Sequence, residues 1–225
     1  MKIVVLSCDK DEDLFYPFKY CLEKYYPTHP EVIYATETIK NPYYKTICKN
    51  YPLEVWSKRI RETLKEIEDN EILLMVDDVF IRNKVDTDRI EYARKHLKGN
   101  TALFNFEKEY DDKNIECSLD GFKLRKKGSD YELSLLCGLW DRKKLIDVLS
   151  KDCDPWSIEY EQNTKHYDYY INSGDFIIDW GYKAFQPVGV VKGKWSKEVM
   201  EYFKKEGIEV DYGKREIFNN NNTLL

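Results

Sequence analysis

The pattern of apolar and polar positions identifies one stretch as the centre of the predicted fold. Residues 72–76 form the continuous apolar run Ile-Leu-Leu-Met-Val, which ends abruptly in two adjacent carboxylates, Asp77 and Asp78. An apolar run without polar alternation is typical of a strand that is covered on both faces, and such strands lie centrally in α/β sheets. We therefore predict a buried central strand over 72–76 whose carboxyl end carries two negative charges.

The first third of the chain predicts a strand, a helix and a second strand. Residues 2–7 form a buried strand, and Asp13 is placed to cap a helix whose apolar positions between 14 and 25 recur at helical spacing. Residues 31–35 form a short second strand after two prolines. This order indicates a βαβ unit with a crevice of nucleotide size at the carboxyl ends of its strands.

A tyrosine-rich loop over 36–51 and an amphipathic helix from Pro52 lead into the central strand. The helix carries an apolar stripe that includes Trp56, and the stripe position favours a core role for this ring over a role in stacking against a ligand. After the central strand, Asp86 or Thr87 begins another helix that runs to Leu97.

The second half of the chain has antiparallel character. We expect a strand over 101–106, hairpins over 116–134, and an apolar segment over 135–140 followed by a helix over 142–149. Pro155 begins a short helix, and Ser196 caps a helix over 197–205 that ends at Gly207. The predicted fold class is therefore α/β, with a mixed central sheet flanked by helices and an antiparallel hairpin in the C-terminal half.

Composition narrows the class of protein. The chain has 225 residues, of which 42% are hydrophobic and 34% charged, and this predicts one folded domain over 1–218 with a disordered tail over 219–225. The net charge of −5 and the pI near 5.4 argue against nucleic-acid binding through a broad positively charged surface. No stretch is apolar enough to cross a bilayer, and the six cysteines show no paired spacing, so we expect reduced thiols and a cytoplasmic location.

The two carboxylates at the end of the central strand are the main candidates for chemistry. Ligands of open α/β sheets collect at the carboxyl ends of the strands, where Asp77 and Asp78 fall. Two ionised carboxylates beside an apolar core require a neutralising partner, and Mn²⁺ or Mg²⁺ held together with a ligand's phosphates supplies one. In the alternative interpretation, the two acids start a turn or cap the next helix.

Other polar residues are placed to line the same crevice. Ser7 and Asp9 follow the first strand, and Asp9 either contacts a base or ribose or is a solvated loop acid. Arg59 reaches a diphosphate if its helix starts beside the crevice, and otherwise it is solvated. Lys192 and Lys194 flank a glycine and are able to fold over a phosphate, although exposed lysines after a strand are commonplace.

The short helix after Pro155 carries a possible acceptor site. Trp156 and Glu159 lie about one turn apart on one helix face. A tryptophan stacks against sugar rings, and a carboxylate on the same face is able to deprotonate a hydroxyl. We assign Trp156, together with Trp140 at the end of the preceding apolar segment, to acceptor binding, and Glu159 to catalysis.

The order of these signals resembles the small bacterial and phage glycosyltransferases of the GT-A type, over nearly the whole chain. The segments that carry the resemblance are 2–7, Trp56-Ser57-Lys58-Arg59, 72–76, Asp77-Asp78-Val79-Phe80, 135–140, 155–159 and Gly193-Lys194-Trp195. The resemblance implies a nucleotide-sugar donor, in particular a UDP-sugar. By the same resemblance Asp77 and Asp78 match the acidic motif Asp-x-Asp that binds metal and donor, with Phe80 in place of its second acid. Glu159 matches the base of inverting members.

Two other functions stay open on the sequence. A metal-dependent nuclease or phosphoesterase uses similar acids, but it needs more of them and usually a histidine, and none of His29, His96 and His166 is beside the motif. A non-catalytic domain that binds a nucleotide or a partner is the other alternative. The acceptor of a transferase is equally open among a glycan, a protein, a small metabolite and a modified base in DNA.

Overall fold

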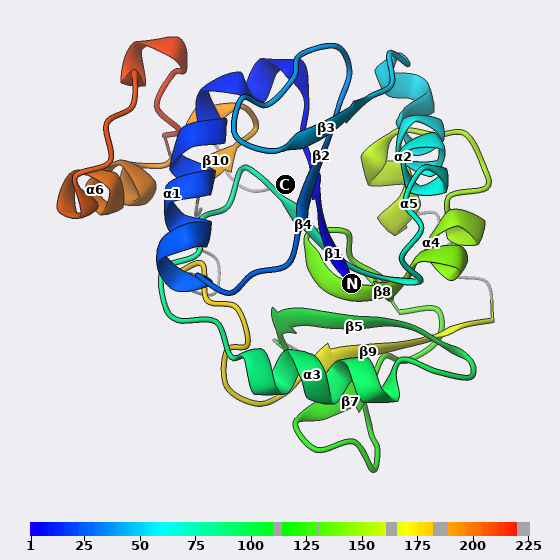
Figure 1. Cartoon of the computed structure of the whole chain (residues 1–225). Coiled ribbons are helices and arrows are strands. Elements are labelled where there is room, and N and C mark those ends of the chain that lie inside the picture. The colour runs from blue at the N-terminus through cyan, green and yellow to red at the C-terminus, as the bar shows by residue number, and fades with distance from the viewer. Residues whose placement is uncertain (110–113, 130, 161–165, 182–188, 220–225) are drawn as a thin grey trace.

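A single large sheet organises the computed structural model, which describes residues 1–109, 114–129, 131–160, 166–181 and 189–219. Within these residues, nine strands follow the order β3-β2-β1-β4-β8-β5-β9-β7-β6 (Figure 1). The predicted fold class, α/β with a mixed sheet and an antiparallel hairpin in the C-terminal half, is confirmed.

The first half of the sheet is parallel. It consists of β1 (Lys2–Leu6), β2 (Val32–Thr36), β3 (Lys45–Cys48) and β4 (Glu71–Val76). The strand β1 lies between β2 and β4, and both pairings are parallel. The four apolar residues at the centre of β4 are at most 2% exposed, which confirms the predicted central strand.

The second half of the sheet is mixed. Its strands are β5 (Thr101–Lys108), β6 (Ile115–Glu116), β7 (Phe122–Leu124), β8 (Cys137–Asp141) and β9 (Asp168–Asn172). The strand β8 runs antiparallel to both of its neighbours, β4 and β5, and so joins the two halves. The apolar segment predicted over 135–140 thus enters the centre of the sheet.

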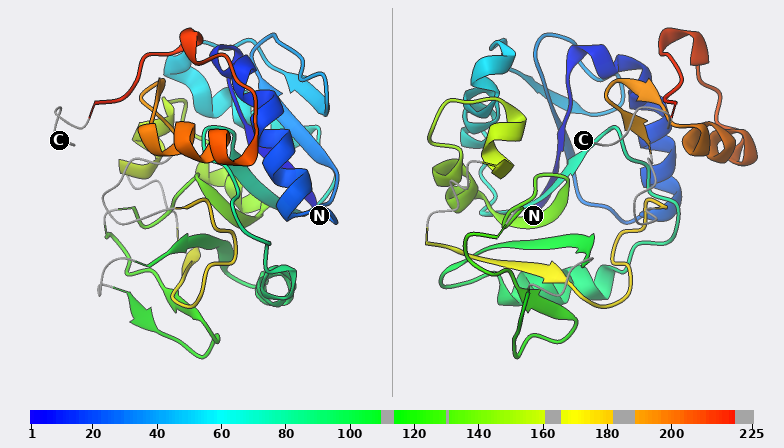
Figure 2. Two further views of the ribbon diagram at one scale, coloured as in Figure 1. Left: turned by 90° about the vertical axis from the view of Figure 1, so that its left-hand side faces the viewer. Right: turned by 180° about the vertical axis from the view of Figure 1, so that it is seen from behind.

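Helices cover both faces of the sheet and create two cores. One core contains residues of α1 (Phe15–Tyr25), α3 (Thr87–His96) and α6 (Lys197–Glu206). The other contains residues of α2 (Trp56–Lys65), α4 (Arg142–Val148) and α5 (Pro155–Tyr160). In both Figure 1 and the left view of Figure 2, α6 lies next to α1. None of the helices in the described part of the chain has the length and apolar character needed to cross a membrane.

Two local predictions were wrong, and a third is confirmed in part. The stretch over 36–51, predicted as a loop, contains the edge strand β3. Ile47 is the one buried residue of this strand. Asp13 does not cap α1, because a 3-10 helix, η1 (Asp9–Leu14), comes first and the side chain of Asp13 binds Arg215 instead. In the hairpin region, the described residues contain one hairpin, β6–β7.

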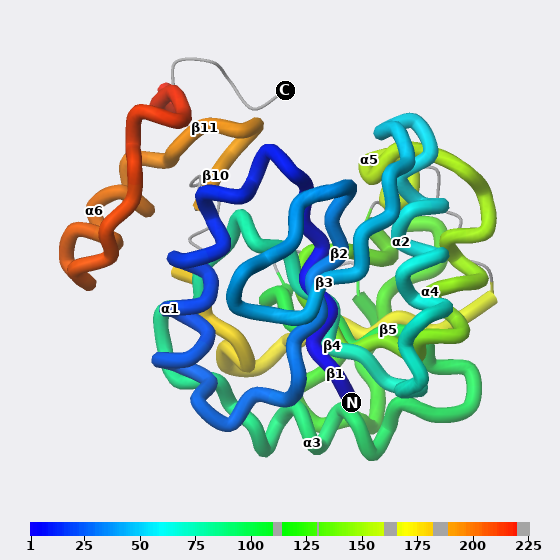
Figure 3. Tube along the Cα trace, turned by 45° about the horizontal axis from the view of Figure 1, so that its top comes forward, coloured from blue at the N-terminus to red at the C-terminus, as the bar shows by residue number. Residues whose placement is uncertain are grey.

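The C-terminal region forms a small layer of its own beside the end of β1 (Figure 3). The strands β10 (Val190–Val191) and β11 (Lys194–Trp195) form an antiparallel hairpin, and α6 follows with Ser196 as its cap and Gly207 at its end, as predicted. A last 3-10 turn, η3 (Tyr212–Lys214), leads to a segment that pairs with β11 at Ile217. Apart from Asn219, the tail predicted to be disordered lies outside the described residues.

Candidate active site

The strands β1 and β4 end side by side and place polar residues at one edge of the sheet. Leu6 is paired with Val76 in parallel register, so Ser7 and Asp77 directly follow at neighbouring positions. Ser7 is 5% exposed and Asp77 is 2% exposed. The ends of these two strands therefore place two buried polar side chains at neighbouring positions of one sheet edge, as the sequence predicted.

Asp77 and Asp78 lie in surroundings that disfavour their negative charge. Burial, together with the neighbouring charges of Asp11 and Asp78, raises the pKa of Asp77 well above its ordinary value, although the Ser7 hydroxyl opposes this by hydrogen bonding. Burial and Asp11 raise the pKa of Asp78 to about 7. One oxygen of Asp77, Oδ2, is buried and has no hydrogen-bond partner among the described residues. A cation at this position would satisfy that oxygen and stabilise both carboxylates.

Arg59 is a buried part of the site and not a solvated helix residue. Its side chain is 3% exposed, and Nη2 donates a hydrogen bond of 2.9 Å to the carbonyl oxygen of Ser7. Nη1 forms an ion pair with Glu37, whereas Nε has no hydrogen-bond partner among the described residues. The guanidinium thus supplies a fixed positive charge at the end of β1, with one donor unused.

Asp9 braces the loop that follows β2. Its carboxylate accepts hydrogen bonds of 2.9 Å from the backbone N–H groups of both Thr38 and Ile39, and another from the Thr38 hydroxyl. The backbone N–H of Asp9 donates to Glu37, the partner of Arg59. Asp9 therefore holds together the loops around Arg59, and both of its oxygens are already in use.

Glu159 lies at the same edge of the sheet, on the far side of β4. Its Oε1 accepts a hydrogen bond of 2.8 Å from the backbone N–H of Leu135, just before β8 begins. Because β8 is antiparallel to β4, its start meets the end of β4, where Asp77 follows. Burial raises the pKa of Glu159, the bond from Leu135 lowers it, and the charge of Glu107 raises it again. A carboxylate with a raised pKa is a better acceptor of a proton.

The two tryptophans assigned to the acceptor have opposite surroundings. Trp156 is 59% exposed on α5, one turn before Glu159, and Asp154 caps this helix by accepting hydrogen bonds from the backbone N–H groups of Trp156 and Ser157. Trp140 is 0% exposed and packs against Tyr169 inside the second core. The assignment of Trp140 to acceptor binding is corrected accordingly, since the second core covers this face of β8 and leaves the ring no surface for a ligand.

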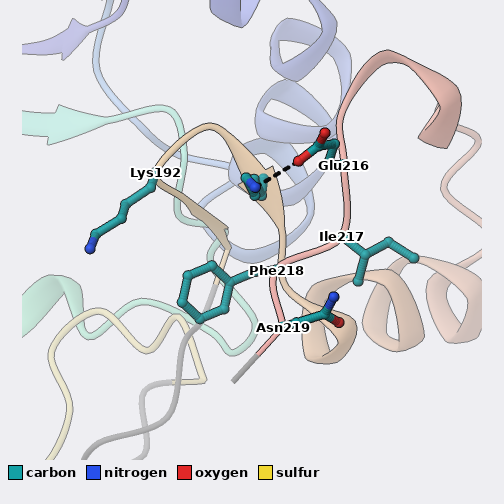
Figure 4. A pocket seen from close by; sticks show the side chains of 6 residues that line it. Lys192, Glu216, Ile217, Phe218 and Asn219 are labelled. Atoms are coloured by element: carbon teal, nitrogen blue, oxygen red, sulfur yellow. Dashed lines mark ion pairs between the residues drawn. The ribbon is translucent and has the colours of Figure 1, made fainter. Parts of the chain in front are cut away.

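The two candidate lysines lie on the β10–β11 hairpin, which is attached to Asp78. The backbone N–H of Val190 donates a hydrogen bond of 2.9 Å to the carbonyl oxygen of Asp78. Lys192 is exposed at the hairpin turn, and Lys194 forms an ion pair of 2.6 Å with Glu216. The two lysines line a cavity of about 210 Å³ together with four residues of the C-terminal segment, Glu216, Ile217, Phe218 and Asn219 (Figure 4).

Four polar residues of the site were missed on the sequence. Glu37, Asp11 and Arg215 have no local signal, because their partners are distant along the chain. Glu107 had a local signal, since it comes directly after the largely apolar run over 102–106, within β5. The amide of Asn105 holds it by donating to its Oε2 at 2.9 Å and accepting from its backbone N–H at 2.8 Å.

The residues at this edge suit a metal ion that the protein binds jointly with a phosphorylated substrate better than an ion bound by protein side chains alone. Within the described ranges, no three side chains of His, Cys, Asp or Glu are grouped so as to bind a metal ion. Asp77 and Asp78 offer two carboxylates, one of them with an unpartnered buried oxygen. Mg²⁺ and Mn²⁺ accept such a set when a substrate's phosphates and water complete the coordination.

The fold, but not the sequence, is similar to known proteins. No protein-family model and no curated protein matches the sequence. S. aureus TarS 1–349 is 12% identical, with a TM-score of 0.51 over 78% of this chain and 59% of that chain. UDP-glucose pyrophosphorylase complexed with UDP-glucose is 8% identical, with a TM-score of 0.51 over 79% of this chain and 91% of that chain.

A further structure of TarS 1–349, in complex with UDP, is 13% identical, with a TM-score of 0.50 over 78% of this chain and 59% of that chain. The chain spans half or less of some longer matches, with 50% of the bifunctional IspDF from Campylobacter jejuni and 36% of a longer TarS chain. These similarities show a GT-A-like fold.

Proposed function

We propose that the protein is a glycosyltransferase that moves a sugar from a nucleotide-sugar donor, in particular a UDP-sugar, to an acceptor hydroxyl with inversion. The observation that carries this proposal is the placement of two kinds of carboxylate at one edge of the sheet. Asp77 and Asp78 lie at the end of β4 beside Arg59, and Glu159 lies across β4 beside an exposed tryptophan. The GT-A-like fold, which TarS shares in complex with UDP, supports a nucleotide donor.

The donor half of the site has to bind and stabilise a diphosphate. The exposed ammonium group of Lys192 and the half-exposed group of Lys194 lie on a hairpin fixed to Asp78, and both groups attract phosphate oxygens. Mn²⁺ or Mg²⁺ fits Asp77 and Asp78, because Asp77 Oδ2 lacks a partner, and when bound it neutralises charge on the departing diphosphate. Ser7, Asp9 and Arg59 shape the floor on which the nucleoside rests.

The acceptor half of the site has to activate a hydroxyl. The acceptor oxygen attacks the anomeric carbon of the sugar, and the bond from that carbon to the donor's phosphate oxygen breaks, with its electron pair leaving on the nucleoside diphosphate. The acceptor proton passes to the Glu159 carboxylate, whose Oε1 is held by Leu135. A single displacement of this kind inverts the anomeric centre. The exposed face of Trp156 is available to stack on the acceptor sugar.

The proposal is tested by measuring slow sugar release from nucleotide sugars in the presence of Mn²⁺, and transfer to simple acceptor sugars. We expect UDP-sugars to be hydrolysed slowly and Asp78→Asn to lose at least about 90% of this activity, because the charge on the departing diphosphate is then poorly stabilised. Asp88→Asn, an exposed acid in the first turn of α3, is the matched control and keeps full activity. Nucleotide binding without any hydrolysis or transfer would instead indicate a non-catalytic binding domain, and the enzymatic proposal would fall.

A further inference from the structure

Arg215 is one of the most extensively bonded side chains in the described part of the protein, and it joins segments about 200 residues apart. Its Nε donates to Asp13 Oδ2 at 2.8 Å, and its Nη2 donates to Asp13 Oδ1 at 2.5 Å and to Asp11 Oδ1 at 2.9 Å. The same nitrogen donates to the carbonyl oxygen of Lys10 at 2.8 Å. The side chain is 7% exposed, and its guanidinium lies 5.7 Å from the centre of the Trp195 ring. Arg215 therefore anchors the C-terminal segment to the loop that follows β1.

The segment that begins at Arg215 is in turn part of the hairpin layer. The backbone N–H of Trp195 donates a hydrogen bond of 2.9 Å to the carbonyl oxygen of Glu216, and the N–H of Phe218 donates one of 2.8 Å to the carbonyl oxygen of Trp195. The Glu216 carboxylate pairs with Lys194. The C-terminal segment is thus joined to β11 by an isolated parallel bridge and an ion pair, and its position constrains that of the hairpin.

The other end of the hairpin layer is attached to the catalytic edge. Val190 donates its hydrogen bond to the carbonyl oxygen of Asp78, and a Cβ on Gly189 would overlap that same oxygen. Gly189 also has a φ of +71°, a value that a residue with a side chain rarely adopts. Besides the packing of Val190 and Trp195 in the first core, the hairpin has polar attachments to Asp78 on one side and, through Arg215, to the carboxylates of Asp11 and Asp13 on the other.

The cavity on the hairpin layer is lined by Lys192, Lys194 and residues 216–219, whose positions depend on this arrangement, whereas Arg215 itself is not among its lining residues. Figure 4 shows Lys192 and Phe218 extending to one side of the hairpin layer and Ile217 extending to the other. The donors of Arg215 already serve carboxylates and a carbonyl. Arg215 is therefore placed to act on a ligand through the residues that it holds.

We propose that Arg215 is a positioning residue, which fixes the β10–β11 hairpin and its two lysines, Lys192 and Lys194, beside Asp78 so that they meet the donor diphosphate. The part that concerns the diphosphate rests on the function proposed above. The part that concerns the hairpin does not, since it follows from contacts within the protein. Each lysine–phosphate contact is a charge-assisted hydrogen bond, so misplacing both weakens UDP binding about tenfold to a hundredfold.

The first test needs no ligand and measures hydrogen exchange of the backbone amides of Val190, Trp195 and Phe218. In Arg215→Met we expect these amides to exchange at least about tenfold faster, because the layer loses its ion pairs with the loop that follows β1. Asp13→Asn, which breaks the same pair from the other side, should shift them in the same direction. Arg89→Met is the matched control, since Arg89 pairs with Asp120 and packs on Tyr92 and is part of a different region. Unchanged exchange in Arg215→Met overturns the proposal.

The second test measures UDP affinity by calorimetry and separates a positioning role from a general loss of stability. We expect Arg215→Met to weaken UDP binding and raise the KM for the donor more than it lowers kcat, with Arg215→Lys intermediate. In a chain that already carries Lys192→Met and Lys194→Met, adding Arg215→Met should cost less than about a factor of two, since the residues through which it acts are gone. An equal loss in both backgrounds overturns the proposal.

The two proposals fail in different ways. If the wild-type chain binds no UDP at all, the proposed function falls, while the exchange measurement still decides whether Arg215 holds the hairpin. If the wild type binds UDP and Arg215→Met binds it equally well, the positioning role falls and the transferase proposal stands.

Discussion

Two substitutions of Glu159 distinguish its proposed chemical role from its structural role. The chemical role is to accept a proton, and the structural role is to accept a hydrogen bond from a backbone N–H. Glu159 Oε1 accepts a hydrogen bond from the backbone N–H of Leu135, and a glutamine amide oxygen is able to accept the same bond. An alanine leaves the buried N–H without a partner, at a cost of about 1–3 kcal/mol of unfolding free energy. Glu159→Ala should therefore lower both stability and activity, whereas Glu159→Gln should lower activity without lowering stability at neutral pH.

The expected loss of turnover follows from the role of a general base. Removing such a group costs roughly 10²–10⁴-fold in kcat. The assay is the steady-state rate of UDP release with saturating donor and acceptor, with unfolding in urea measured on the same preparations. Glu209→Gln, an exposed acid after α6, is the control and keeps wild-type values. A Glu159→Gln enzyme that turns over within about threefold of wild type would refute the assignment of the base.

The pH dependence of stability gives an independent check on the surroundings of Glu159. Burial raises its pKa above the ordinary value of 4.5, so the folded state prefers the protonated carboxyl. Above that raised pKa the folded chain holds a charge that the unfolded chain would solvate better, and stability is lost as the pH rises between the two pKa values. Glu159→Gln carries no such charge. Its stability relative to wild type should therefore increase from pH 4 to pH 8, and a constant difference would contradict the buried environment.

Three further substitutions test the framework around the site. Arg59→Met leaves Glu37 without its buried partner and should lower the unfolding free energy by about 3 kcal/mol, measured in urea. Gly189→Ala should cost about 1–3 kcal/mol in the same assay, since its Cβ overlaps the Asp78 carbonyl at a positive φ. Trp156→Ala should leave stability within about 0.5 kcal/mol, because the ring is exposed, but raise the KM for a sugar acceptor and not that for the donor.

Features that depend on neighbouring residues were predictable from the sequence. The strand β4 was identified because burial on both faces requires an unbroken apolar run, and α6 because Ser196 and Gly207 satisfy the two ends of a helix. The adjacency of Ser7 and Asp77 followed from the rule that parallel strands end at a common edge. These properties are local, or follow from one pairing.

Features that depend on distant partners were not predictable. Asp13 precedes an apolar helical pattern just as a capping residue does. Its carboxylate instead binds the side chain of Arg215, which is 202 residues away along the chain. The strand β3 lies at an edge with one buried residue, so it shows no alternation. Trp140 follows glycine and leucine in a run that fits either an interior strand or an exposed end, and it is buried because distant residues of the second core, including Tyr169, pack over it.

The central claim is that the end of β4 presents Asp77 and Asp78 to a phosphorylated donor, and a crystal structure with UDP and Mn²⁺ tests it most directly. The account predicts a diphosphate at the carboxyl edge of β1 and β4, with the metal ion between its oxygens and the carboxylates of Asp77 and Asp78. A nucleotide bound at another surface, with both carboxylates remote from it, would contradict the account.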